Sequence, residues 1–315
     1  MPTDRSGSPA RFDSLRALAG DRLRLHEPLS RYTVARLGGP ADALLEADTV
    51  ELLESALRLA WAEGWPVRVL GGGANVLISD QGIRGLVVIN NARAVQIDDS
   101  GMVQAESGAG LIAVARMCMA RGLAGLEWAI GVPGTLGGAI INNAGAHGGD
   151  MAGNLVEALI AVPDQPAAWW PVERMAYCYR QSALKARPTP YVVLAGRLRL
   201  APGHDPASLM AAAEAFTAHR KRTQPPGASL GSMFKNPPGD YAGRLIEAAG
   251  LKGTRIGGVM ISPVHANFFV NTGGGTAHDY AHLIRLAREA VQSQFGVALE
   301  LEIELIGEGF EAEAP

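Results

Sequence analysis

Apolar residues recur at helical spacing in several parts of the chain, most clearly between residues 50 and 62. One face of that segment carries four apolar side chains: Leu53, Leu57, Ala60 and Trp61. Asp48 and Glu51 have the spacing of a capping box, with Asp in place of Ser or Thr. The same kind of pattern predicts helices at about 111–121, 207–221, 242–249 and 277–295.

Short apolar runs bounded by turn residues predict strands at 67–70, 86–89, 155–162, 191–200, 266–271 and 299–306. In the last run Glu300, Glu302 and Glu304 alternate with apolar residues, so the three carboxylates share one strand face. We expect at least two of them to face solvent. A single glutamate that faces a pocket would be the exception, and the alternation does not identify it.

The glycine run at 71–75 separates two fold classes. A dinucleotide-binding Rossmann turn leads directly into a helix, whereas here Val76-Leu77-Ile78 is followed at once by a turn signal, Ser79 to Gly82, and by another strand. The glycines therefore join strand to strand. No lysine follows the run, which also excludes a Walker loop.

Size and composition narrow the class of protein. A chain of 315 residues exceeds one compact core and predicts two or three domains. The net charge of −3 argues against nucleic acid as a main partner. Cys118 and Cys178 are far apart, so they predict neither a disulfide framework nor a metal site. Residues 1–14 are expected to be disordered.

Targeting signals are not apparent in the sequence. The polar N-terminal residues lack the apolar core of a signal peptide. The best candidate for a membrane span, 111–126, is interrupted by Arg116 and Arg121. We expect a cytoplasmic protein that binds no membrane.

Two glycine-rich segments, 71–75 and 131–139, carry many backbone N–H groups and few side chains. Successive amides in a tight turn form a concave nest that binds phosphate oxygens. One such run would more often be an ordinary turn. Two runs, each with a polar residue (Asn75 and Thr135), favour a cradle for a pyrophosphate.

The segment from Gly231 to Asp240 brings Ser232, Lys235 and Asn236 together between glycines and prolines. It can present a proton donor and a cation to an anionic substrate, although a polar loop before a helix is about equally consistent with the pattern. Arg180 follows an aromatic residue and is suited to a carboxylate. His265 is expected to be a buried hydrogen-bonding residue rather than a base.

Taken together, these segments resemble the UDP-N-acetylenolpyruvoylglucosamine reductase family, in its shorter subtype without the tyrosine-bearing insert. The resemblance covers nearly the whole chain. It rests on the order and spacing of several segments: 32–41, 71–79, 131–145, 179–182, 231–237, 242–247, 265–268 and 299–302.

The resemblance implies an α+β fold of the vanillyl-alcohol-oxidase type, with three domains. These are an FAD-binding domain at 1–90, to which the C-terminal strand at 303–315 returns, a second FAD-binding domain at 91–218, and a substrate-binding domain at 219–302. Non-covalent FAD would be held by residues matching family positions: Gly71, Gly72, Gly73, Ala74, Asn75, Val76, Pro133, Gly134, Thr135, Gly138, Ala139 and Asn143.

The resemblance also implies the reaction, an NADPH-dependent reduction of the enolpyruvyl ether of UDP-N-acetylglucosamine to UDP-N-acetylmuramate for peptidoglycan synthesis. Arg180 and Glu302 would flank the substrate carboxylate, and Ser232 would give a proton to C2. Lys235, Asn236 and Arg222 would lie on the side of the substrate diphosphate. We expect a monomer without a metal.

Two alternatives stay open at this point. One is another flavoprotein of the same fold, such as a sugar or hydroxy-acid oxidase with covalent FAD, for which His147 is the plausible attachment residue. In the family a tyrosine or phenylalanine often occupies that position. The other is a non-catalytic nucleotide-sugar binding protein, which would keep the phosphate nests without needing Ser232, Arg180 and Glu302 together.

Overall fold

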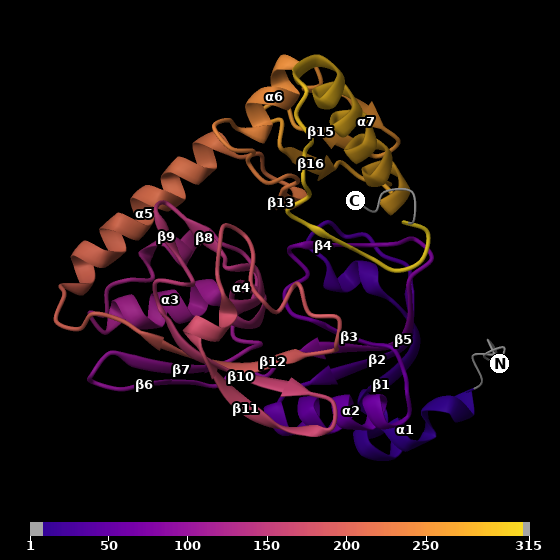
Figure 1. Cartoon of the computed structure of the whole chain (residues 1–315), viewed down its shortest axis with the longest axis vertical. Helices are drawn as coiled ribbons and strands as arrows, with labels where there is room; N and C mark the ends of the chain where they lie inside the picture. The colour runs from indigo at the N-terminus through magenta and orange to yellow at the C-terminus, as the bar shows by residue number, and fades with distance from the viewer. Residues whose placement is uncertain (1–8, 311–315) are drawn as a thin grey trace.

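The structure is a computed structural model that describes residues 9–310 and arranges them around three sheets (Figure 1). The first sheet has the order β1-β2-β5-β3, in which β1 is antiparallel to β2, and both β2 and β3 are parallel to β5. Its strands are β1 (Leu23–Pro28), β2 (Pro40–Ala47), β3 (Val67–Leu70) and β5 (Ile83–Asn90). The short helical segments around it are η1 (Pro9–Phe12), η2 (Gly20–Arg22) and η3 (Leu29–Tyr32).

Two helices, α1 (Asp13–Ala19) and α2 (Val50–Ala62), bury their apolar faces in one core with β2 and β5. The prediction of α2 is confirmed at both ends. Its N-cap is Thr49, whose hydroxyl accepts from the Leu52 N–H at 3.2 Å, so the predicted cap at Asp48 is wrong by one residue. The ordered elements η1 and α1 also contradict the disorder predicted for residues 9–14. Residues 1–8 lie outside the described part.

The second sheet is antiparallel throughout, in the order β11-β10-β12-β7-β6. Its strands are β6 (Val95–Ile97), β7 (Met102–Glu106), β10 (Leu155–Val162), β11 (Gln165–Pro171) and β12 (Val192–Arg199). The remaining elements here are α3 (Leu111–Ala120), η4 (Glu127–Gly131), α4 (Leu136–Asn142), the β8–β9 pair (Gly145–Ala146 and Gly149–Asp150) and η5 (Val172–Met175).

Helix α4 was not predicted, because it is only seven residues long and glycines occupy two positions of its first turn. It packs closely on β12 because position 196 is glycine. A Cβ there would lie 2.7 Å from the Ile140 Cδ1 atom. This close packing brings the glycine-rich segment that precedes α4 next to the first sheet.

The third sheet, β13-β16-β15-β14, is also antiparallel and is covered by α6 and α7. Its strands are β13 (Ala228–Ser232), β14 (Arg255–Ile256), β15 (Val259–Ile261) and β16 (Phe268–Asn271), and the helices are α6 (Ala242–Ala248) and α7 (Ala277–Phe295). The long helix α5 (Pro206–Thr223) connects this part to the second sheet (Figure 1).

The first and third parts dock through specific contacts. Ala35 and Leu37 from the first part are buried in the core around α7. The Asn271 side-chain amide donates to the Ala35 carbonyl at 2.9 Å. The Asp80 carboxylate accepts from two backbone N–H groups at the start of α7, at 2.9 and 3.0 Å. These contacts hold the third part in a defined position relative to the first sheet.

The chain then returns to its beginning, because β17 (Glu304–Ile306) pairs in parallel with β4 (Val76–Ile78). The strand predicted at 299–306 is therefore shorter than expected, and Leu301 forms only an isolated bridge, to Phe234. The predicted α+β class is confirmed. We propose the three predicted domains, with the second boundary moved to Gln224, because α5 runs unbroken across position 218.

Candidate active site

A cleft of about 860 Å³ is lined by residues from all three parts of the molecule. This volume lies in the upper part of the range of about 300–1,000 Å³ for ligand sites, which leaves room for a large ligand. Every predicted cofactor-binding residue lines this cleft except Asn143, and so do Ser232, Arg180 and Glu302. Side chains that are far apart in the sequence thus reach one cavity.

The two glycine-rich turns face each other across the cleft at very short range. A Cβ at position 71 would lie 2.3 Å from the Thr135 Oγ1 atom, and one at position 72 would lie 3.1 Å from the Gly134 Cα atom. Gly73 has φ +59°, and its Cβ would lie 2.0 Å from a backbone carbonyl. Only glycine allows this approach. Backbone N–H groups of such glycine-rich turns can bind the diphosphate of a dinucleotide.

Two of the predicted cofactor-binding residues also hold the site together. The Asn75 side-chain amide donates to the Glu302 carbonyl at 3.2 Å. Asn143 is buried, with φ +44°, and its side-chain amide donates to the Cys178 carbonyl at 3.1 Å. Asn143 therefore anchors the loop that carries Arg180 instead of lining the cleft.

Arg180 and Glu302 form an ion pair in the wall of the cleft. The Arg180 Nε–H donates to Glu302 Oε1 at 2.8 Å, and an Nη2–H donates to the Gly145 carbonyl at 2.7 Å. The backbone of Arg180 is left-handed, with φ +57°, in the tight turn where Cys178 and Gln181 pair. Burial raises the pKa of the Glu302 carboxyl, and the Arg180 guanidinium opposes that rise without cancelling it.

The three glutamates of the alternating segment have different surroundings. The Glu302 side chain is 21% exposed, against 63% for Glu300 and 55% for Glu304. Glu300 pairs with Lys235 and Glu304 with Arg68. The expectation that two of the three would be mostly solvated is confirmed, and Glu302 is the one that is mostly buried, although Glu304 also lines the cleft.

Backbone pairing explains how Ser232 and Glu302 come together. Ser232 is the last residue of β13, and the next residues run alongside the segment that carries Glu302. The Glu302 N–H donates to the Met233 carbonyl at 3.0 Å, and the Lys235 N–H donates to the Glu300 carbonyl at 2.8 Å. The hydroxyl and the carboxyl are thereby held in one cleft.

Asn267 stabilises this pairing through the backbone of Phe234. Its buried side chain accepts from the Phe234 N–H at 2.9 Å and donates to the Phe234 carbonyl at 2.8 Å. The Asn267 N–H in turn donates to His265 Nδ1 at 3.2 Å. The prediction that His265 is a hydrogen-bonding residue is confirmed, although the residue is half-buried and not buried as expected.

The predicted substrate-binding residues do not line the cleft. The Lys235 side chain is buried and its ammonium pairs with Glu300. The Asn236 side chain accepts from the Ala242 N–H at the start of α6, at 3.1 Å. Arg222 is exposed in the last turn of α5. Direct contact of these residues with a substrate stays a prediction.

Several polar residues that the sequence did not single out also line the cleft, among them Lys185, Arg220 and Gln224. Arg220 packs so closely on Gly131 that a Cβ there would lie 2.3 Å from the arginine Cδ, and burial lowers the pKa of its guanidinium. A helical projection of α5 could have indicated that Arg220 and Arg222 point to different sides. Lys185 follows Arg180 by five positions, which is a weak signal.

His147 does not line the cleft. Its ring stacks on Phe216 of α5, with the ring centroids 4.1 Å apart and the planes 7° apart. Burial lowers the pKa of the imidazole, and Arg220 lowers it further. This position disfavours the alternative of a flavin attached through His147.

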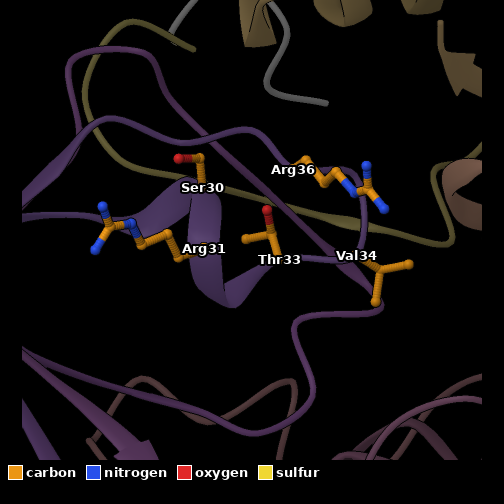
Figure 2. A pocket seen from close by; sticks show the side chains of 5 residues that line it. All are labelled: Ser30, Arg31, Thr33, Val34 and Arg36. Atoms are coloured by element: carbon orange, nitrogen blue, oxygen red, sulfur yellow. The ribbon is translucent and has the colours of Figure 1, made fainter. Parts of the chain in front are cut away.

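A second, shallow hollow lies beside the Gly71–Asn75 turn, since the Val34 N–H donates to the Gly73 carbonyl at 3.0 Å. Figure 2 shows that Arg31 and Arg36 point away from each other there. Cations that diverge do not make an anion site.

Within residues 9–310, no group of three or more His, Cys, Asp or Glu can hold a metal ion, and no helix is both long and apolar enough to cross a membrane.

Comparison with known proteins gives consistent matches over the chain. Residues 223–306 match the family model of the UDP-N-acetylenolpyruvoylglucosamine reductase C-terminal domain, and residues 41–163 match an FAD binding domain. A UDP-N-acetylenolpyruvoylglucosamine reductase of Rubrobacter xylanophilus is 48% identical over 287 residues, which is 90% of this chain and 95% of that protein. One of Chloroflexus aggregans is 46% identical over 90% of this chain and 97% of that protein.

A solved structure agrees with these sequence matches. The crystal structure of UDP-N-acetylenolpyruvylglucosamine reductase from Thermus caldophilus superposes with a TM-score of 0.76 at 35% identity. The superposition covers 90% of this chain and 100% of the Thermus caldophilus chain. The likeness therefore extends over all three sheets.

Proposed function

Because this chain belongs to the UDP-N-acetylenolpyruvoylglucosamine reductase family of FAD-dependent oxidoreductases, we propose that it reduces UDP-N-acetyl-3-O-(1-carboxyvinyl)glucosamine to UDP-N-acetylmuramate, with NADPH as reductant. The product is a precursor of peptidoglycan. The meeting of Ser232 with the Arg180–Glu302 pair in one cleft is the observation that carries the proposal.

The glycine cradle fits FAD. The turn at 71–76 and the segment from Pro133 to Ala139 would hold the diphosphate through backbone amides, since the two backbones approach too closely for side chains. Asn143 would act indirectly, through the loop that it anchors. When bound, FAD supplies hydride transfer between the nicotinamide and the substrate alkene.

Arg180 and Glu302 would stabilise the negative charge that develops on the substrate carboxylate. Arg180 is already oriented by its bonds to Glu302 and Gly145, so little reorganisation is needed when charge develops. Burial raises the pKa of the Glu302 carboxyl, and in its protonated form this carboxyl can donate a hydrogen bond to that charge. Together they would act as a preorganised pair of donors.

Ser232 would give a proton to C2 of the enolpyruvyl group. A serine hydroxyl is a weak acid in water, so it has to act at short range on a strongly basic carbon. Its position at the end of β13 is fixed by the pairing of residues 233–235 with residues 300–302. The backbone thus holds the donor still while the side chain stays in the cleft.

An anaerobic titration tests this function. The purified protein should be yellow, should be bleached by NADPH, and should regain its colour only with the enolpyruvyl nucleotide sugar. Reoxidation by a simple sugar or hydroxy acid would instead favour an oxidase, and a colourless protein that binds UDP sugars would favour a binding protein.

We further propose that the protein acts as a monomer in the cytoplasm, because a single chain supplies every wall of the cleft. Sedimentation of the yellow protein should give the mass of one chain. A stable dimer would contradict this part of the proposal.

A further inference from the structure

Lys185 is anchored in the wall of the cleft, near the C-terminal end of α4. Its ammonium donates to Asn142 Oδ1 at 3.1 Å, and Asn142 also lines the cleft. The loop that carries it is fixed as well. The Lys185 N–H donates to the Ser182 carbonyl at 3.1 Å, and the Ser182 hydroxyl donates to the Ile141 carbonyl at 2.6 Å. The side chain is held on one side of the cavity.

The ammonium of Lys185 forms no ion pair within residues 9–310, although two carboxylates line the same cleft. Glu302 pairs with Arg180 and Glu304 with Arg68. An ammonium carries three N–H donors, and the neutral amide of Asn142 accepts from one of them. Donors therefore remain for a ligand.

A second lysine, Lys235, does not line the cleft. It is buried and paired with Glu300, so Lys185 is the lysine that the cleft exposes. Burial lowers the pKa of Lys185 and repulsion from Lys235 lowers it further, while attraction to Glu304, Glu300 and Glu302 opposes this shift.

Resting on the proposed function, we propose that Lys185 binds the phosphate oxygens of a nucleotide diphosphate in the cleft. Lysine binds phosphate oxygens as a compact point charge, and the proposed function already assigns Arg180 to the substrate carboxylate. Such a diphosphate occurs in the nucleotide sugar, in NADPH and in FAD. These three sources share one chemistry, and binding measurements separate them.

The test compares the Lys185→Gln holoenzyme with the wild type. Isothermal titration with UDP-N-acetylmuramate, UDP and NADP⁺ measures the first two sources, and flavin fluorescence on dilution measures the release of FAD. We expect affinity for one source to fall roughly tenfold, the scale of one charge-assisted hydrogen bond. Lys185→Arg should restore part of it. Lys252→Gln, whose lysine pairs with Glu247 outside the cleft, is the matched control.

The outcomes separate cleanly. Weaker binding of both UDP ligands assigns Lys185 to the nucleotide sugar, weaker NADP⁺ binding assigns it to the reductant, and faster FAD release assigns it to the cofactor. Weaker binding of UDP-N-acetylmuramate with unchanged binding of UDP would mean a carboxylate contact, and would overturn the proposal. So would no change in any arm. A wild type that binds no UDP ligand would refute the proposed function instead. The measurements with NADP⁺ and FAD would then still test whether Lys185 binds a diphosphate.

Discussion

At the scale of single residues, the chemistry depends on three groups with separate roles. The Ser232 hydroxyl would supply a proton, while Arg180 and Glu302 would stabilise charge. Both roles belong to the half-reaction in which the substrate reoxidises the flavin, so substitutions should slow that half-reaction and leave flavin reduction by NADPH nearly unchanged. The ion pair at 2.8 Å also means that a change at Glu302 alters the surroundings of Arg180.

Ser232→Ala tests the proton donor. We expect reduction of the bound flavin by NADPH to stay nearly unchanged, while reoxidation by the enolpyruvyl substrate slows by at least roughly a few hundredfold, the scale of general-acid catalysis. Stopped-flow absorbance of each half-reaction measures both rates. Equal slowing of the two would refute the role of Ser232.

Glu302 predicts a pH dependence. Because burial raises its pKa, the protonated donor is lost as pH rises through that raised value, and reoxidation by the substrate should slow over the same range. Glu302→Gln keeps a donor that does not titrate, so this limb of the pH profile should disappear. Glu302→Ala should cost about a hundredfold in rate. An unchanged profile in the Gln variant would assign the limb to another group.

At the scale of elements, the catalytic loop depends on one buried side chain. Asn267 satisfies both the N–H and the carbonyl of Phe234. The pairing of residues 233–235 with 300–302 is thereby tied to β16.

We expect Asn267→Ala to lower the free energy of unfolding by about 2 kcal/mol or more, since two buried polar groups lose their partners. Urea denaturation measures this. Gln294→Ala, at an exposed position of α7, should change stability by less than about 0.5 kcal/mol. A loss no larger than that of the control would mean that the loop has other support.

At the scale of the whole molecule, the cleft exists only where the three parts meet. The first and second parts approach at the facing turns, and the third docks through Ala35, Leu37 and the Asp80 contact with α7. Neither glycine turn would form a cradle alone. Cofactor binding should therefore report on how these parts sit relative to one another.

Gly71→Val tests that junction. The added Cβ would lie 2.3 Å from the Thr135 Oγ1 atom, so either the Thr135 side chain or the two turns must move, and we expect the purified protein to lose most of its FAD. The flavin-to-protein absorbance ratio measures this. Gly110→Ala is the control, because φ there is −64° and a Cβ would meet nothing nearer than 3.9 Å. Full flavin content in the valine variant would show that the turns can yield.

Local patterns were sufficient wherever neighbouring residues set the conformation. The bounds of α2 and α7, and a glycine turn that joins two strands, follow from spacing and turn residues alone, because each depends on contacts within a few positions. The motifs likewise indicated the family and its cofactor, because their order and spacing can be seen in the sequence without knowledge of the fold.

The three-dimensional packing settled which side chains face the cleft. Glu302 differs from Glu300 and Glu304 only in its surroundings, and strand alternation treats all three alike. Lys185 and Arg220 line the cavity, whereas Lys235 pairs with Glu300 and the Asn143 side chain donates to the Cys178 carbonyl. These outcomes depend on contacts between segments more than thirty positions apart along the chain, and no pattern within one segment encodes them.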